Sequence, residues 1–308
     1  MVSVTVPEHL RAEVRDFLTT RRERITPERA GLPFYGGTRR VKGLRREEVS
    51  MLAGVSVDYY TRLERGNLAG VSEEVLEALA SALQLDEAER AHLFDLARSS
   101  HADSTARTRT SRTATRQTVR PGVQRILDTI STPAHVRNGR FDLLAANRMG
   151  RALLSLPAEG VESFNFARYV FLDPRARDFY VDWVTVARDC VAALRIEAGR
   201  NPYDKRLTDL VGELSTRDED FRTWWASHNV KLHVSTTKRF RHPVAGEFEL
   251  TGEALELPAD PGLTLVTYTY EPASPAEQAL AFLASWSTNP PDRALRRDAS
   301  DGATNHRE

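Results

Sequence analysis

The chain has 308 residues, enough for two domains of ordinary size, and 41% of them are apolar and 28% charged. This composition excludes a fibrous or mostly disordered chain, and because 43 basic residues balance 43 acidic ones, the net charge indicates no partner. No run of about 20 apolar residues could span a membrane, the N-terminus lacks the order of a signal peptide, and the single cysteine, Cys190, excludes an intramolecular disulfide and a cysteine-rich zinc site. We therefore expect a cytoplasmic protein that does not associate with membranes.

The balanced charge is unevenly distributed along the chain. Residues 21–65 carry 11 basic and 6 acidic side chains, whereas residues 66–98 carry 2 basic and 7 acidic ones. Residues 99–120 are rich in Ser, Thr and Arg and almost lack large apolar side chains, which predicts a flexible linker. The predicted organisation is an all-helical domain over 1–98, a linker over 99–120, a second domain over 121–286 and a disordered tail over 287–308.

The first domain is predicted to contain five helices. Leu10, Val14, Phe17 and Leu18 repeat with helical spacing and indicate the apolar face of the first helix. Two short helices are predicted over 45–53 and 57–65, and two longer ones follow. The expected N-caps of the last three helices are Ser56, Ser72 and Asp86, and Glu89 completes a capping box with Asp86.

The segment 46–66 has the spacing of two short helices that pack closely around a tight turn. Ser50 is small where the second helix must cross, and Gly54 falls in the turn, where a left-handed backbone suits only glycine. Apolar side chains, among them Tyr60, supply the seam between the helices. This pattern is typical of a helix-turn-helix whose second helix enters the DNA major groove, although an ordinary helical hairpin has a similar pattern.

These residues also carry a resemblance to a known family. Residues 43–66, GLRREEVSMLAGVSVDYYTRLERG, resemble the Cro/repressor-type helix-turn-helix of the xenobiotic-response-element superfamily and, more narrowly, the bacterial MmyB-like regulators. The later segments NGRFDLLAANRMGRALL, DPRARDFYVDW, LVGELSTRDEDFRTWWASHNV and HPVAGEFEL are similar to the ligand-binding domain of that family. The resemblance covers about 10–286, and it implies an N-terminal DNA-binding domain followed by a PAS-like domain that binds a ligand and dimerises. The long connection between the first two helices departs from many superfamily members.

Position along the motif assigns DNA-contacting roles. Arg46 opens the second helix, where a phosphate can bind. Arg62 is predicted to contact guanine, with a phosphate contact as the alternative, and Asp58 to accept from cytosine, to cap the helix or to orient Arg62. In resembling domains Glu64 pairs with an arginine of the first helix, here Arg21 or Arg22, and Tyr60 is expected in the core. The predicted DNA contacts are Arg39, Arg40, Arg45, Arg46, Ser56, Val57, Asp58, Tyr59 and Arg62.

The second domain is predicted to be α+β, with about five antiparallel strands interrupted by helices. Asn138-Gly139 lies between two alternating apolar runs and indicates a hairpin. One long helix is predicted to start at Asp173-Pro174, with a stripe formed by Phe179, Trp183, Val186, Cys190 and Leu194. Helices over 203–214 and 218–228, strands over 231–240, 247–257 and 263–270, and a closing helix over 275–286 complete the prediction.

The aromatic content of this domain favours a cavity for a small lipophilic effector, which the family resemblance implies to be fatty-acid-like. A carboxylate on that effector needs a cationic or amide partner, for which Arg137, Asn147, Arg195 and His228 are candidates. Because the linker makes a rigid lever between the domains improbable, we expect any coupling to run through dimer contacts. The predicted lining residues are Arg137, Asn147, Phe166, Tyr169, Trp183, Trp225 and His228.

Catalytic and cofactor motifs are missing from the sequence. It contains no glycine-rich phosphate loop and no nucleophile elbow, the spacing of His228 and His233 is not that of a metal motif, and Cys190 is expected to be a buried thiol. The leading hypothesis is a sequence-specific, homodimeric transcription regulator that binds double-stranded DNA, with no enzymatic activity, metal or cofactor. The alternative is a small-molecule-binding or enzymatic protein whose helical domain only mediates protein contacts.

Overall fold

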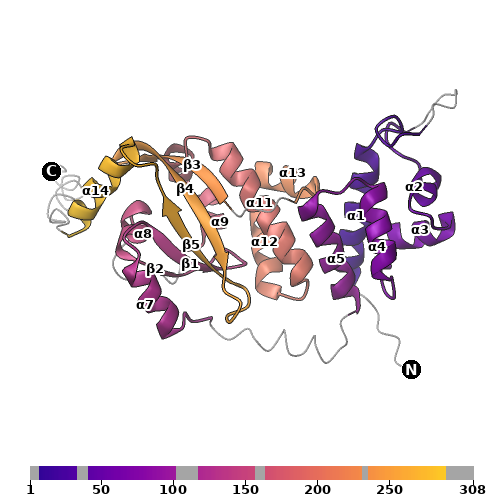
Figure 1. The fold of residues 1–308 in the computed structure, drawn as a ribbon, viewed down its shortest axis with the longest axis horizontal. Coiled ribbons are helices and arrows are strands. Elements are labelled where there is room, and N and C mark those ends of the chain that lie inside the picture. The colour runs from indigo at the N-terminus through magenta and orange to yellow at the C-terminus, as the bar shows by residue number, and fades with distance from the viewer. Residues whose placement is uncertain (1–6, 33–40, 102–116, 157–163, 231–234, 289–308) are drawn as a thin grey trace, which may run out of the picture.

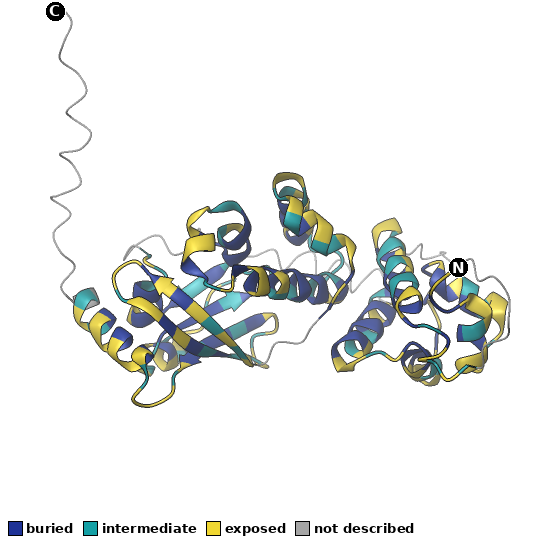
Figure 2. Cartoon of the chain, turned by 90° about the horizontal axis from the view of Figure 1, so that it is seen from above, coloured by how far each residue is buried: buried dark blue, intermediate teal, exposed yellow. Residues whose placement is uncertain are grey.

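The computed structural model describes residues 7–32, 41–101, 117–156, 164–230 and 235–288. The molecule is elongated, with a helical first domain at one end and a second domain built around a sheet at the other (Figure 1). Each helix carries buried residues along one side and exposed residues along the other (Figure 2). Within the described ranges, no helix is both long and apolar enough to cross a membrane.

The five helices predicted for the first domain are confirmed. Their N-caps are confirmed too: Ser56 and Ser72 each accept a hydrogen bond from the backbone three residues on, and Asp86 and Glu89 exchange side chain-to-backbone hydrogen bonds. The face of the first helix that was predicted from helical spacing is fully buried. The helices are α1 (Glu8–Arg24), α2 (Arg46–Leu52), α3 (Val57–Glu64), α4 (Glu73–Ala82) and α5 (Glu87–His101).

The boundaries of the linker and tail differ from the prediction where the structure describes them. Helix α5 continues through residues 99–101, because the Ser100 hydroxyl donates to Leu96 O and His101 Nε2 accepts from the Gly70 N–H at 2.6 Å. The described residues resume at 117, before the predicted end of the linker at 120. The last helix continues to Thr288, beyond the predicted start of the tail at 287. The remaining residues of the predicted linker and tail, 102–116 and 289–308, lie outside the described residues.

The second domain is α+β, as predicted, with one five-stranded antiparallel sheet in the order β2-β1-β5-β4-β3. The predicted hairpin at Asn138-Gly139 joins β1 to β2. The strands are β1 (Ala134–Asn138), β2 (Leu143–Ala146), β3 (Ser235–His242), β4 (Gly246–Glu256) and β5 (Leu263–Thr269). The helices are α7 (Pro121–Thr129), α8 (Arg148–Leu153), α9 (Phe166–Leu172), α10 (Arg175–Phe179), α11 (Trp183–Arg200), α12 (Lys205–Arg217), α13 (Glu219–Ala226) and α14 (Pro275–Thr288).

The long helix predicted from Asp173 onward is two helices, α10 and α11. The break has a physical cause, because the backbone between them bonds to the edge strand of the sheet. Tyr180 bridges to Phe240 of β3, and the Val181 N–H donates to Arg239 O at 3.0 Å. The predicted apolar stripe is still fully buried, since both helices pack their apolar sides inward. Helices α7 and α9 were not predicted.

Helices lie against both faces of the sheet. His135 pairs in register with Val266, and both face α9–α11, whereas the neighbouring pair Val136 and Leu265 packs against α7. Adjacent residues of a strand point to opposite faces, so the register places α7 on the far side from α11. The face toward α9–α11 therefore encloses the larger core, and the cavity described below.

The two domains are in direct contact, whereas we expected any coupling between them to run through dimer contacts. Helix α11 packs against α1 and α5, and Ile196 and Val230 complete the apolar core of the first domain. An ion pair also joins the domains, between Arg195 of α11 and Glu13 of α1. Figure 1 shows α11 and α13 lying beside α5, with α2 and α3 at the outer end of the molecule.

Candidate functional site

The turn between α2 and α3 has the geometry that the sequence predicts. Gly54 has φ +65°, the left-handed conformation that glycine adopts without strain. Ser50 is 2% exposed where the two helices meet, and its hydroxyl donates to Glu47 O within α2. The turn thus holds α3 across α2, with the start of α3 outward.

A buried carboxylate locks α3 to the helices around it. Glu64 accepts from Arg22 Nε at 2.6 Å and from Arg46 Nε, and its side chain is 1% exposed. The predicted pairing of Glu64 with the first helix is confirmed for Arg22, while Arg21 pairs with Glu89 at 3.0 Å. Tyr60 is fully buried, as expected, and burial together with the charge of Glu64 raises the pKa of its hydroxyl. Arg46 therefore has a structural partner inside the domain, and its half-exposed guanidinium remains at the surface.

The outward face of α3 presents the remaining predicted DNA contacts. Val57 and Asp58 are exposed at its first turn, which Ser56 caps. Arg62 lies over the ring of Tyr59, at 4.7 Å from the guanidinium carbon to the ring centre. Two of the roles predicted for Asp58 are filled by other residues. Ser56 caps α3, and the side chain that lies against Arg62 is that of Tyr59. Arg45 is exposed at the start of α2, and Arg39 and Arg40 lie outside the described residues.

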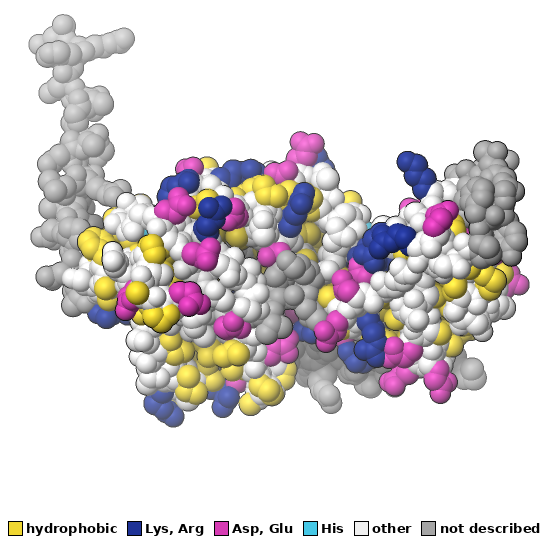
Figure 3. Space-filling model, turned by 45° about the horizontal axis from the view of Figure 1, so that its top comes forward, with side chains coloured by type: hydrophobic (Ala, Val, Ile, Leu, Met, Phe, Trp, Pro, Cys, Tyr) yellow, Lys and Arg dark blue, Asp and Glu magenta, His cyan; other side chains and the backbone are white. Residues whose placement is uncertain are grey.

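The positive charge of residues 21–65 is smaller at the surface than the sequence count suggests. Arg21 and Arg22 are buried in ion pairs with Glu89 and Glu64. On the face drawn in Figure 3, basic and acidic side chains are interspersed over both domains. Among the described residues, the geometry of α2 and α3 therefore marks the candidate DNA-contacting surface.

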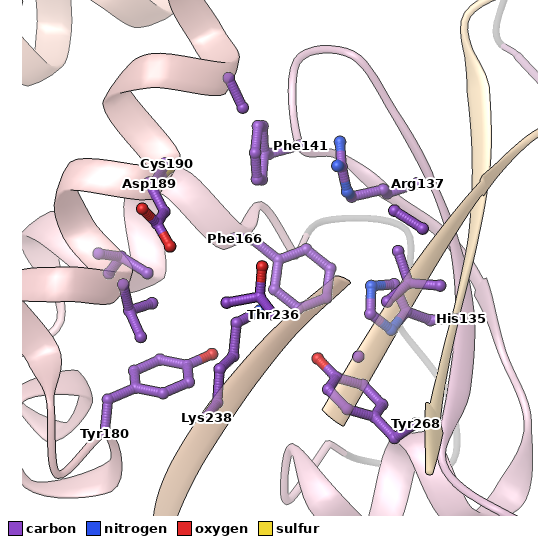
Figure 4. Close-up of a pocket in the computed structure, with 16 residues that line it drawn as sticks. His135, Arg137, Phe141, Phe166, Tyr180, Asp189, Cys190, Thr236, Lys238 and Tyr268 are labelled. Atoms are coloured by element: carbon purple, nitrogen blue, oxygen red, sulfur yellow. The ribbon is translucent and has the colours of Figure 1, made fainter. Parts of the chain in front are cut away.

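The second domain contains a cavity of about 110 Å³ between the sheet and α9–α11 (Figure 4). Gly252 leaves room beside Tyr268, because a Cβ there would lie 3.0 Å from the Tyr268 ring. The lining residues are His135, Arg137, Phe141, Phe166, Val170, Tyr180, Val186, Asp189, Cys190, Ala193, Thr236, Lys238, Gly252, Ala254, Val266 and Tyr268. Strands β1, β3, β4 and β5 thus provide one wall, and α9 and α11 provide the other.

The cavity holds two cationic side chains, Arg137 and Lys238, against one carboxylate, Asp189. Arg137 lies 4.1 Å from the centre of the Phe141 ring, and no ion pair joins it to a carboxylate among the residues that the structure describes. Figure 4 shows the hydroxyls of Tyr180 and Tyr268 on opposite sides of the space. The site therefore combines an apolar lining with positively charged donors that suit an anion.

Burial controls the ionisation of the lining groups. Burial, together with the charges of Arg137 and Lys238, lowers the pKa of His135 well below its ordinary value, so the imidazole is neutral. Burial raises the pKa of Cys190 to about 12 and that of Tyr180 well above its ordinary value. The expectation of a buried thiol is confirmed, and at neutral pH this thiol is not a nucleophile.

The structure places only two of the seven predicted lining residues, Arg137 and Phe166, at this cavity. Asn147 instead caps α8, where its side chain accepts from Gly150 and Ala134 N–H and donates to Ile130 and Thr132 O. Tyr169 packs among other aromatic rings, and the Trp183 indole donates to Val170 O at 2.8 Å.

Trp225 and His228 lie at the contact between the domains. The Trp225 ring lies 3.8 Å from the Arg195 guanidinium carbon, and His228 Nδ1 lies 3.0 Å from Arg195. Arg195 was also a candidate partner for the carboxylate of an effector, but it lies between the two domains and not in the cavity. The bulky aromatic residues were a poor guide to the lining because most of them fill the core.

Sequence reasoning identified Arg137 but missed the other strand residues of the cavity. His135 and Arg137 are two residues apart on β1, as are Thr236 and Lys238 on β3. Alternation along each strand puts such pairs on one face, which is the signal that could have identified them. In the described ranges, no cluster of His, Cys, Asp and Glu could hold a metal ion.

Comparison with known protein families gives two matches. Residues 13–93 match the model of a helix-turn-helix domain. Residues 119–283 match the model of the MmyB-like transcription regulator ligand binding domain. No curated protein matches the chain.

Proposed function

Since this chain belongs to the MmyB-like transcription regulators, whose ligand-binding domain accounts for more than half of it, we propose that it binds double-stranded DNA sequence-specifically and senses a small lipophilic anion. The helix-turn-helix domain and the ligand-binding domain make it a ligand-responsive transcription regulator. The observation that carries the sequence-specific part is the exposed face of α3, where Arg62, in the last turn, is held over Tyr59. We also propose a Cro/repressor-type docking mode and a PAS-like second domain.

DNA recognition is tested with the purified full chain. Fragments captured from a random double-stranded library are sequenced, and binding to the enriched site is titrated at several salt concentrations. We expect one enriched sequence and an affinity that falls steeply with salt, because phosphate contacts release counterions. Equal affinity for enriched and scrambled DNA would contradict sequence-specific recognition.

The effector is proposed to be a carboxylate with a compact apolar body. Arg137 and Lys238 supply the charge complement, and Phe166, Val170 and Val186 supply the apolar contacts. The volume of about 110 Å³ is below the roughly 150 Å³ of an engineered cavity that admits benzene. A short acid therefore fits as the cavity stands, whereas a long fatty-acid chain requires α9–α11 to move away from the sheet.

Calorimetric titration of propanoate and butanoate into the full chain tests this site, together with native mass spectrometry for co-purified ligand. Arg137→Gln removes the buried cation, and we expect it to weaken binding at least tenfold, since hydrogen bonds to charged groups contribute about 1.5–3 kcal/mol. Arg125→Gln, at an exposed position of α7, is the matched control and should not change affinity. Equal affinities for the two variants would place the anion elsewhere.

We propose that the protein is a non-enzymatic, cytoplasmic homodimer. The neutral Cys190 thiol and the match to two regulator domains support a binding role over catalysis. One helix-turn-helix contacts few base pairs, so a dimer on two half-sites is the usual way to gain affinity and specificity. Size-exclusion chromatography with light scattering tests the oligomeric state.

A further inference from the structure

Helix α11 takes part in two sites at once. Its first half contributes to the wall of the cavity, and its second half contacts the DNA-binding domain. The cavity residues are Val186, Asp189, Cys190 and Ala193, and the docking residues are Arg195, Ile196, Gly199 and Arg200. Cys190 and Arg195 are separated by only about 7.5 Å along the helix axis. A displacement of the cavity wall along or around this axis therefore also displaces the docking residues.

The docking contact is centred on a fully buried arginine. Arg195 Nη1 donates to the two carboxylate oxygens of Glu13 on α1 at 2.5 and 2.6 Å, and the Arg195 side chain has no exposed surface. Burial by itself would raise the pKa of Glu13, but the charge of Arg195 and a hydrogen bond from His228 outweigh burial and hold that pKa well below its ordinary value. Arg195 has lost its water and Glu13 is only 17% exposed, so each charge is largely compensated by its partner in the other domain.

Steric and polar contacts surround this ion pair. A Cβ on Gly199 would lie 2.6 Å from Cε1 of His92 on α5, so only glycine permits this approach. The Ser99 hydroxyl donates to Gly199 O at 2.9 Å, and Arg200 pairs with Asp95 at 3.2 Å. The α1/α5 surface, formed by Glu13, His92, Asp95 and Ser99, thus matches the second half of α11 in shape and charge.

The α1/α5 surface lies away from the recognition helix. Figure 1 shows α5 and α1 toward the effector domain and α3 toward the outer end of the molecule. Docking therefore leaves α3 accessible to DNA, and it fixes the direction in which α3 points relative to the effector domain. In a dimer, that direction determines whether two recognition helices can occupy both half-sites together.

We propose that the contact between the α1/α5 surface and the second half of α11 persists in solution, and that Arg195 is a positioning residue through which the effector cavity controls the orientation of the recognition helix. The coupling rests on the proposed function, because it requires that α3 binds DNA and that the cavity binds an effector. The docking rests only on the contacts described above. A ligand at Asp189 and Cys190 acts by favouring one placement of α11, and such control requires different ligand affinities for the two placements.

Docking is tested by hydrogen exchange of residues 9–21 and 92–101 in the full chain. Gly199→Ala inserts a methyl group against His92, and Arg195→Met removes the buried charge. We expect both variants to exchange at least tenfold faster in these two segments. Gly212→Ala, where a Cβ meets nothing within 4 Å, is the matched control and should leave exchange unchanged.

A rescue separates docking from general damage. In the Gly199→Ala background, His92→Ala removes the ring that the new methyl group meets, and exchange in residues 9–21 should return toward the wild-type rate. Unchanged exchange in both Gly199→Ala and Arg195→Met overturns the docking proposal. Tryptophan fluorescence shows whether the effector domain of each variant is folded, because all four tryptophans lie in that domain.

Coupling is tested without a ligand by filling the cavity from α11. Ala193→Leu adds atoms at the cavity wall, and Val184→Leu adds atoms at a 48% exposed position of the same helix. We expect Ala193→Leu alone to change exchange in residues 9–21 and 92–101 at least threefold, and to change affinity for the captured DNA at least fivefold. Exchange equal to wild type in Ala193→Leu overturns the coupling. If the wild-type chain binds no DNA, the proposed function fails, and the exchange data still decide docking and coupling.

Discussion

Single residues show how charge counted along the sequence differs from charge presented to a partner. Glu64 accepts from both Arg22 and Arg46, and Glu89 pairs with both Arg21 and Arg24. Two carboxylates thus take up four arginines, and two of those arginines are buried. Sequence reasoning located the helix that is proposed to contact DNA, but the partner of each arginine depends on how the helices pack. Arg62 is exposed on that helix, as its proposed role requires.

Arg62 and Arg46 should differ in how they affect DNA binding. We expect Arg62→Ala to cost about 1–3 kcal/mol of discrimination at one base pair, because base recognition is the role proposed for its guanidinium. Arg46→Ala should weaken binding to all sequences alike and also destabilise the domain, because Glu64 loses one of its two partners. Titrations on the captured site and its single-base variants measure both effects.

The controls for this pair use stability and sequence dependence. Melting temperatures measured in parallel show how much of the Arg46→Ala effect is unfolding. Glu77→Gln breaks an exposed ion pair of the same domain and should leave both stability and specificity nearly unchanged. If Arg62→Ala weakens every sequence equally, Arg62 contacts phosphate and not base.

His135 should make the effector domain less stable in mild acid. Its pKa is lowered in the folded state, so below its ordinary value of about 6.5 the unfolded chain takes up a proton that the folded chain does not. Stability is therefore complete above pH 6.5 and falls as the pH drops, with a slope of up to about 1.4 kcal/mol per pH unit. Denaturation followed by tryptophan fluorescence between pH 7.5 and 5 measures the slope.

His135→Gln removes this titration and should flatten the pH dependence. Part of it should remain, because burial also lowers the pKa of His242. An identical slope in wild type and His135→Gln would show that other groups cause the acid sensitivity.

Elements were predictable from the sequence where their signals are local. The N-caps, the turn at Gly54 and the apolar faces of the first domain follow from spacings of a few residues, and the structure confirms them. The separation of α10 from α11 was not predictable, because it depends on a backbone contact with β3, some 60 residues later in the chain. An apolar stripe indicates which residues are buried, but it does not show where one helix ends and the next begins.

Gly54 provides a test of the turn between α2 and α3. Gly54→Ala places a side chain at φ +65°, and we expect a loss of about 1 kcal/mol in the free energy of unfolding of the first domain. Gly212→Ala, inside α12, should instead stabilise its domain by about 0.5–1 kcal/mol. Scanning calorimetry of the full chain follows both. Equal effects of the two substitutions would exclude backbone strain as the cause.

At the scale of the whole molecule, the two sites differ in how far the sequence determines them. The proposed DNA-contacting surface comes mainly from one segment of about 20 residues, so a local pattern is enough to predict where it lies. The cavity combines β1, β3, β4 and β5 with α9 and α11, and only the strand register shows that His135 and Lys238 share a face. The contact between Arg195 and Glu13, 182 positions apart, has no local signal at all.

The first domain should fold without the second, with a boundary at 101 and not at 98. Fragment 1–101 keeps the hydrogen bond between Gly70 and His101, whereas fragment 1–98 loses it. We expect cooperative melting of both fragments by circular dichroism, with 1–98 melting about 4–8 °C lower if about 1 kcal/mol is lost. His101→Ala in 1–101 isolates the contribution of the histidine. The absence of a cooperative transition in 1–101 would show that α11 is needed to complete this fold.

The placement of α3 at the end of the molecule farthest from the sheet has a consequence for the DNA that this protein occupies (Figure 1). If two chains associate end to end, through the ends of their effector domains that lie farthest from α3, the two α3 helices are separated by nearly the combined length of both molecules. Half-sites in adjacent turns of the double helix would then be too close together. The operator should instead consist of two short motifs with a long, sequence-tolerant spacer. In a nuclease-protection experiment on the operator, we expect two short protected segments separated by DNA that the nuclease still cuts.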